Sequence, residues 1–309
     1  VIELVRLWKY LQRNRKDIDI VHFYSTILIL LGPTVAWLAG MPSIVTITGM
    51  GRTFSSTNGS FRLFRPLYLL LFGVSLLFSS RVLCQTRSDL AFLSKRFPLA
   101  KRKFAYIGSG LSMVTLQDKD FRIPQLRILL VARLMPDKGI QDFLAVAEKL
   151  HDKGQFKFVL VGPSSPGCEN LLRTVREYDS AGVINYMGEL SPAETLAQFT
   201  QSHIFFFPSS YGEGVSRVLL ECGFMCMCPI VYDLPGNHDL VSKGRGYLVK
   251  KGDTETVALL LKALERDRGH LESNAISYRK HVSNCFNMDA FSKRMDDLLL
   301  DVAKENGIQ

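Results

Sequence analysis

Residues 127–139 read RILLVARLMPDKG, an unbroken apolar run that leads directly into a turn with two cations and a glycine. The run has the length and the branched side chains of a strand buried on both faces of a parallel sheet. An amphipathic pattern follows over residues 139–151 and predicts a helix of about three turns. A strand joined to a helix by a tight turn is the repeating unit of a doubly wound α/β domain.

The same alternation continues outward in both directions. In the second half we expect strands over residues 127–132, 157–162, 183–187, 204–208, 229–232 and 246–249, with helices over 139–151, 168–178, 192–201, 215–223 and 254–266. In the first half we expect strands over 18–22, 43–48, 82–85 and 104–108, with helices over 2–13, 26–38, 63–79 and 88–97. The fold class that follows is α/β, with two Rossmann-like domains.

A polar stretch at residues 116–124 separates the two halves. We therefore predict a first domain over residues 1–120, a second over 121–285 and a C-terminal helical segment over 286–309. Only about four strands are apparent in the first domain, and the chain does not begin with Met. We expect that domain to be incomplete at its start.

The composition is that of a globular protein, with 309 residues of which 47% are hydrophobic and 22% charged. It excludes disordered and collagen-like chains. The six cysteines show no paired framework, which favours a reducing compartment. The net charge of +9 is uneven, because residues 1–124 hold 17 Lys and Arg against 6 Asp and Glu. This excess indicates a phospholipid surface, a nucleic acid or a phosphorylated lipid as partner, or else serves solubility alone.

Two apolar segments bear on a membrane. Residues 67–78 read LYLLLFGVSLLF, and a second run covers residues 27–41. Both are shorter than the ~20 residues that a spanning helix needs. Arg62, Arg65 and Arg81 flank the first run. Apolar burial beside arginines suits contact with one face of an anionic bilayer, and a buried core helix is the alternative.

The strongest chemical pattern is YGEGVSRVLLE at residues 211–221, which follows the strand at 204–208. If a helix opens at Glu213, the eight-residue step to Glu221 rises ~12 Å and returns near the same face. That spacing suits one carboxylate on a sugar hydroxyl and the other on a ribose, and Gly214 and Val215 would offer backbone N–H groups to a phosphate. Two solvated helix glutamates are the alternative.

Two further turns follow strands. Arg133 and Lys138 flank the turn at the carboxyl end of the strand at 127–132, where a guanidinium and an ammonium could neutralise a diphosphate. Gly49 and Gly51 follow the strand at 43–48 and allow the backbone to approach a ligand closely. Phe54 occupies the third glycine position of a dinucleotide fingerprint, so that motif is absent.

Together these motifs resemble the retaining nucleotide-sugar glycosyltransferases of GT-B fold, family four. VARLMPDKG resembles the donor-phosphate motif of that family, EGVSRVLLE its Glu-x7-Glu motif, and YDLPGNHDLV with GRGYLV its C-terminal signature. In the first half, TITGMGRTF and YIGSGL resemble the branch that elongates polyprenyl-diphosphate-linked saccharides for O-antigen or capsule.

The resemblance implies two domains that face each other across a cleft, and a C-terminal helix that packs back on the first domain. Arg133 and Lys138 would hold the diphosphate of a nucleoside diphosphate sugar, which we expect to be UDP-linked. Glu213 would contact the donor sugar and Glu221 the ribose, while Gly49 and Gly51 would shape the acceptor wall. Neither a metal nor another cofactor is implied, and the reaction would retain the anomeric configuration.

The implied acceptor is a lipid-linked saccharide, and the implied location is the cytoplasmic, inner face of a bacterial plasma membrane, held peripherally on an anionic surface. We expect no nucleic acid as partner, and the oligomeric state stays open. Two alternatives remain: a nucleotide-sugar epimerase of the same architecture, and a nucleic-acid-binding protein that uses the basic half.

Several residues depart from the family pattern or compete with it. Ser216 stands where the family has Pro, and Thr48 where many relatives have His, so no general base is assigned. His22 at the end of a strand and His238 in a turn are as well explained by structural hydrogen bonds. The Asp-x-Asp pairs at 17–19 and 118–120 and the cysteines at 222, 226 and 228 resemble metal motifs, but surface charge and buried thiols explain them better.

Overall fold

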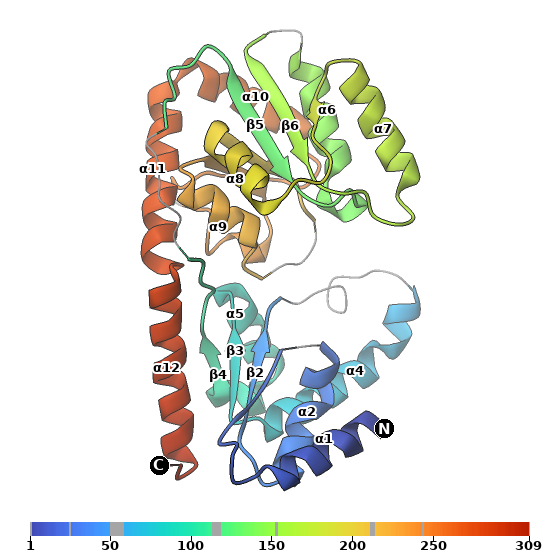
Figure 1. Cartoon of the computed structure of the whole chain (residues 1–309), viewed down its shortest axis with the longest axis vertical. Coiled ribbons are helices and arrows are strands. Elements are labelled where there is room, and N and C mark those ends of the chain that lie inside the picture. Colours follow the sequence, from blue (N-terminus) through green and yellow to red (C-terminus); the bar gives the residue numbers. More distant parts are fainter. Residues whose placement is uncertain are drawn as a thin grey trace. The chain divides into compact units, whose positions relative to one another are not determined.

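The computed structural model describes the chain in two compact units (Figure 1). Unit 1 comprises Val1–Gly110, Gly212–Val215 and Met288–Gln309, and unit 2 comprises Leu111–Tyr211 and Ser216–Asn287. The residues that the structure describes are 2–24, 26–49, 59–112, 119–151, 154–210, 214–242 and 244–308.

Unit 1 is built on a parallel sheet of four strands in the order β1-β2-β3-β4 among its described residues. Its elements are α1 (Ile2–Arg13), β1 (Val21–Phe23), α2 (Thr26–Leu38), β2 (Ser43–Ile47), α4 (Gly59–Phe78), β3 (Arg81–Cys84), α5 (Arg87–Arg96), the 3₁₀ helix η1 (Pro98–Lys103), β4 (Phe104–Tyr106) and the C-terminal α12 (Met288–Glu305). The strands and helices expected from the sequence are present, with ends that are the same or differ by up to four residues.

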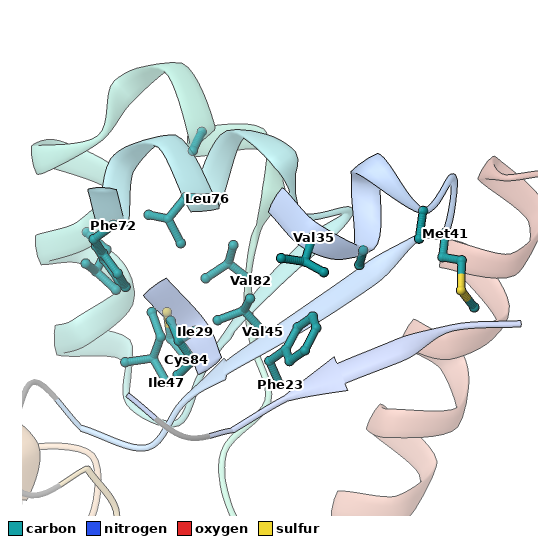
Figure 2. Close-up of a cluster of buried hydrophobic side chains, with 14 of the residues drawn as sticks. Phe23, Ile29, Val35, Met41, Val45, Ile47, Phe72, Leu76, Val82 and Cys84 are labelled. Atoms are coloured by element: carbon teal, nitrogen blue, oxygen red, sulfur yellow. The ribbon is translucent and has the colours of Figure 1, made fainter. Parts of the chain in front are cut away.

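Side chains alternate between the two faces of this sheet, and each face has its own core. On one face Val45 and Val82 pack under α2 and α4 with Phe72 and Leu76 (Figure 2). On the other face Ile44, Leu83 and Ile107 meet Val302 of α12.

The packing of α12 on unit 1 follows from its sequence. Phe291, Met295, Leu298 and Val302 recur at helical spacing and form one apolar stripe, which lies against the second face of the sheet. Arg294 donates from Nε to the carbonyl of Ile107 at 2.9 Å. The last described helix, α12, is therefore a structural part of unit 1.

In its described residues, unit 2 holds six parallel strands in the order β10-β9-β8-β5-β6-β7. Its elements are β5 (Leu126–Val131), η2 (Pro136–Lys138), α6 (Ile140–Leu150), β6 (Phe156–Val161), α7 (Glu169–Ser180), β7 (Asn185–Tyr186), α8 (Pro192–Gln201), β8 (Ile204–Phe207), α9 (Arg217–Phe224), β9 (Cys228–Tyr232), η4 (Pro235–Asn237), β10 (Tyr247–Val249), α10 (Thr254–Arg266) and α11 (Arg268–Cys285). Together with unit 1 this confirms the predicted α/β class with two Rossmann-like units.

Helix starts in both units are fixed by side-chain caps. The Thr86 hydroxyl accepts the N–H of Asp89 at 2.9 Å at the start of α5. Ser191 and Glu194 form a reciprocal capping box at the start of α8. Asp253 accepts the N–H of Thr256 at 3.0 Å at the start of α10.

Two features of unit 2 differ from the sequence-based expectation. The helix α9 begins at Arg217 with Ser216 as its N-cap residue, so Glu213 does not open it and the one-helix relation between Glu213 and Glu221 was wrong. The helix α11 was not predicted at all. Among the described residues, no helix combines the length and the apolar character that crossing a membrane requires.

Candidate functional site

The strand order of unit 2 creates a switch point between β5 and β8. These two strands are neighbours, with Ile128 beside Ile204. From β5 the chain proceeds outward through α6 to β6, whereas from β8 it proceeds in the opposite direction through α9 to β9. The two connections leave the sheet on opposite sides, and the crevice at the carboxyl ends of such strands is where open α/β sheets bind ligands.

The turn after β5 is fastened to the end of β8 at this point. Gly139 has a φ of 69°, and a Cβ there would lie 2.1 Å from the carbonyl oxygen of Pro208. The carbonyl of Asp137 accepts the N–H of Ser210 at 2.8 Å. Only glycine permits this close approach, so the DKG sequence fixes the position of η2 beside the β8 end.

The two predicted cations both lie on this edge. Arg133 is exposed and makes no hydrogen bond or ion pair with another described residue. The ammonium of the half-buried Lys138 lies 5.9 Å from the ring centroid of Phe207, the last residue of β8. Positive charge is therefore held at the switch point by two side chains from one short turn.

The helix that follows β8 adds backbone donors to the same edge. Ser216 is extended at the N-cap position, and its side chain makes no capping hydrogen bond. The first N–H groups of α9 are thus not satisfied by a cap, which is the arrangement that favours an anionic ligand.

The described acid of the Glu-x7-Glu motif sits one turn further along α9. Glu221 accepts a hydrogen bond from Nε of Arg217 at 3.0 Å, and its side chain is 25% exposed. Sequence reasoning missed this pairing, although an Arg and a Glu four residues apart on a helix predict it. Glu213, the other acid of the motif, and Gly51 lie outside the described residues, and their roles stay predictions.

In unit 1 the predicted glycine Gly49 lies directly beyond β2 with a φ of 146°. Gly214, which is grouped with unit 1, donates its N–H to the carbonyl of Thr48 at 3.1 Å, and a Cβ at Gly214 would lie 2.4 Å from that oxygen. Val215 follows it and is half-buried. A glycine is therefore required at 214 for the backbone to approach Thr48 so closely.

A polar cluster at the carboxyl ends of β1 and β2 was not predicted as a group. His22 Nε2 lies 2.7 Å from the hydroxyl oxygen of Thr46, and the ring of Tyr24 lies 4.1 Å from the His22 ring. Burial lowers the pKa of His22 and so disfavours the charged imidazolium. Period-2 alternation in β1 could have shown that His22 and Tyr24 share a face.

The competing motifs have structural explanations. His238 Nε2 pairs with Asp233 at 2.5 Å. Cys222, Cys226 and Cys228 are buried free thiols, and burial raises the pKa of Cys222 and Cys228. Asp17 and Asp19 are exposed. Within the described part of the chain, no three His, Cys, Asp or Glu side chains are placed to share a metal ion.

Comparison with known families gives a match over residues 116–282, to the family described as glycosyl transferases group 1. That segment contains the switch point, both cations and the Glu-x7-Glu motif.

Two curated proteins to which the chain is similar are also glycosyltransferases. The chain is 30% identical over 153 residues to the N,N'-diacetylbacillosaminyl-diphospho-undecaprenol alpha-1,3-N-acetylgalactosaminyltransferase of Campylobacter jejuni, a match that covers 48% of this chain and 38% of the relative. It is 23% identical over 314 residues to the UDP-Gal:alpha-D-GlcNAc-diphosphoundecaprenol alpha-1,3-galactosyltransferase of Escherichia coli, covering 97% and 79%.

Among solved structures, HepE of Anabaena in complex with UDP superimposes with a TM-score of 0.81 at 14% identity, covering 96% of this chain and 82% of that one. At this identity the similarity establishes the fold, which is the GT-B architecture that the sequence motifs implied.

Proposed function

The chain belongs to the family of group 1 glycosyl transferases, and from that membership we propose that it transfers a hexose or N-acetylhexosamine from a nucleoside diphosphate sugar to a lipid-linked saccharide. The observation that carries the donor half is the pair of cations, Arg133 and Lys138, at the switch point of unit 2. The acceptor half is supported by two relatives whose names specify diphosphoundecaprenol-linked sugars. UDP as the nucleotide is supported by its presence in the HepE complex.

In the proposed reaction the bond between the anomeric carbon and the diphosphate oxygen breaks, and a bond forms to an acceptor hydroxyl oxygen. The hydroxyl proton leaves with the departing nucleoside diphosphate. Arg133 and Lys138 stabilise the negative charge that develops on the leaving group, and the α9 N-terminus adds N–H donors. No divalent metal is required when fixed cations perform this role.

The remaining assignments come from the family pattern. Glu221 would bind the ribose, which requires that its hydrogen bond with Arg217 be exchanged for one with the ligand. Glu213 would contact the donor sugar, and Gly49 and Gly51 would line the acceptor side. Attack on the face from which the diphosphate departs would retain the anomeric configuration.

The proposed location is the cytoplasmic face of the membrane, held peripherally through unit 1. Of the large hydrophobic residues that are exposed in the described structure, all but Met187, Leu259 and Ile276 belong to unit 1. Unit 1 also contains most of the basic excess. Exposed apolar side chains among cations are the surface that binds to anionic bilayers.

The decisive experiment is a panel of nucleoside diphosphate sugars with a short-chain polyprenyl-diphosphate saccharide as acceptor. We expect one donor to give a product extended by one sugar, with the donor's anomeric configuration in the NMR spectrum. Donor conversion without acceptor would instead indicate an epimerase. Absence of any donor turnover together with tight, salt-dependent oligonucleotide binding would replace the proposal with a nucleic-acid-binding function.

A further inference from the structure

An apolar groove of 670 Å³ lies on the outer surface of unit 1. One wall is α4 from residue 65 to residue 77, and the other is the segment from residue 96 to residue 100, where α5 passes into η1. Its volume falls in the range of small-molecule sites, about 300–1,000 Å³. The lining is apolar apart from Arg65 and Arg96.

The groove is built into the packing of these elements. Phe97 packs edge-on against Phe72 with ring centroids 5.5 Å apart, and it approaches α4 at Gly73, where a Cβ would lie 3.2 Å from its ring. The small residue thus lets the Phe97 ring sit against the helix between the two walls. Lys103 fixes η1 to the end of α4, because its ammonium donates to the carbonyls of Leu77 and Ser79.

Apolar side chains on both walls of the groove are exposed to solvent. Leu70, Val74 and Leu77 follow one another at helical spacing along α4 and are 64%, 37% and 42% exposed. Leu99 on the opposite wall is 85% exposed. Four exposed apolar side chains around one groove indicate a ligand with a hydrocarbon chain.

The charge around the groove identifies the headgroup. Between residues 59 and 112 the chain has nine Lys and Arg residues and a single acid, Asp89, which is buried in the first turn of α5. Arg65 and Arg96 line the groove, and Lys101 and Arg102 follow in the exposed part of η1. Arginines bind phosphate oxygens through paired N–H donors.

One end of the groove lies away from the substrate edge of the sheet. The C-terminal end of α4 leads into the start of β3, and η1 leads into the start of β4. The end of the groove near Leu77 and Leu99 therefore lies toward the amino ends of the strands. Ligands that react are expected at the carboxyl ends, so a hydrocarbon chain in the Leu77 end of the groove would lie away from the reacting groups.

We propose that this groove binds a single hydrocarbon chain of an anionic phospholipid, whose phosphate is held by Arg65 and Arg96. The lipid would fasten unit 1 to the bilayer surface. This inference builds on the membrane surface in the proposed function and is independent of the transfer reaction.

The test is binding of lysophosphatidylglycerols of increasing chain length to the full chain, by calorimetry below the concentration at which they form micelles. Each added methylene should strengthen binding about fourfold, as its transfer out of water predicts. Binding should stop strengthening when the chain fills the groove. The lysophosphatidylcholine of equal chain length should bind at least fivefold more weakly, and Arg65→Gln with Arg96→Gln should remove this difference.

Matched variants separate the groove from the general surface. Leu70→Asp places a carboxylate on an exposed groove wall, and we expect it to weaken lysophosphatidylglycerol binding at least tenfold. Leu38→Asp makes the same change at a residue of unit 1 that is 59% exposed and outside the groove, and Leu259→Asp does so in unit 2. Both controls should bind as the unchanged protein does.

Equal binding by Leu70→Asp and the unchanged protein would overturn the proposal, as would equal losses in Leu70→Asp and Leu38→Asp. Displacement of the lysolipid by a polyprenyl diphosphate at lower concentration would assign the groove to the acceptor and would also overturn it. Leu70→Asp should retain turnover with a short-chain acceptor. Absence of turnover in the unchanged protein would contradict the proposed reaction. It would not bear on lipid binding, which the calorimetry measures independently.

Discussion

Gly139 and Gly182 share nearly the same backbone conformation but differ in what surrounds them. Their φ angles are 69° and 74°. A Cβ at Gly139 would lie 2.1 Å from the Pro208 carbonyl oxygen, whereas nothing lies within 4 Å of one at Gly182. Substitutions at these two positions therefore distinguish the energetic cost of the left-handed conformation from the cost of disturbing the close contact between two loops.

We predict that Gly182→Ala lowers the free energy of unfolding by about 1–2 kcal/mol, since it meets only the cost of the left-handed conformation. Gly139→Ala should lower it by at least about 2 kcal/mol more, because the β5 turn must also move away from the β8 end. Urea denaturation measures both variants. Equal effects would show that the approach to Pro208 is not rigid.

His203 links the stability of unit 2 to pH. Its ring is buried, and its Nδ1 accepts the N–H of Arg127 at 3.3 Å. Burial, with the positive charges of Lys119, Arg268 and Arg127, lowers the pKa of His203 from 6.5 to about 4. Protonation is thus disfavoured in the folded state only.

The sign of the effect follows from this lowered pKa. Above pH 6.5 the imidazole is neutral in both the folded and the unfolded state, so it adds no pH dependence to the free energy of unfolding. Between pH 6.5 and about 4 the unfolded chain takes up the proton first, so stability falls as the pH is lowered, by about 3 kcal/mol at most. We predict that His203→Gln has a flatter stability profile over this range in urea titrations. A profile as steep as that of the unchanged protein would contradict the assignment.

At the scale of elements, the sequence predicted four helices with the ends that the structure has, and in two of them, α8 and α10, a side-chain cap fixes the start. The helices at 2–13, 26–38, 192–201 and 254–266 have the predicted ends. The start of α9 was placed two residues early although Ser216 is a preferred N-cap residue. The helix α11 was missed because polar residues surround its buried positions, although Leu271, Ala275, Tyr278 and Val282 have helical spacing.

The site was predictable only in part, because some of its contacts join segments that are far apart in the sequence. Arg133 and Lys138 flank one local turn, so their shared edge follows from the strand before them. The adjacency of β5 and β8, which makes that edge a switch point, joins segments about 75 residues apart and has no local signal. The contact between His22 and Thr46 depends on strand register in the same way.

The packing of α12 on unit 1 gives an element-scale prediction. Val302 is fully buried against Ile44 and Leu83, whereas Leu300 on the same helix is 57% exposed. We predict that Val302→Ala lowers the free energy of unfolding by roughly 1–3 kcal/mol. Leu300→Ala should change it by less than about 0.5 kcal/mol. Equal effects in urea denaturation would mean that α12 does not contribute to the core of unit 1.

At the scale of the whole molecule, the two units have different surfaces. Unit 1 carries most of the positive excess and most of the exposed apolar side chains. Residues 125–309, which include both switch-point cations and the α12 segment of unit 1, hold 21 Lys and Arg against 23 Asp and Glu. Membrane binding and donor binding should therefore be separable by substitution. A loss of membrane binding would then indicate a change in unit 1, and a loss of donor binding a change in unit 2.

We predict that Arg133→Gln with Lys138→Gln lowers kcat/KM for the nucleotide-sugar donor about 10²–10³-fold or more, because both charges that stabilise the leaving diphosphate are removed. Flotation of the same variant with phosphatidylglycerol vesicles should be unchanged. Lys157→Gln removes an exposed cation of unit 2 from β6, away from the switch point, and should leave transfer unaltered. If fixed cations replace a metal, excess EDTA should not slow the unchanged protein. Loss of transfer in EDTA that Mg²⁺ or Mn²⁺ restores would show that the two side chains do not perform this role alone.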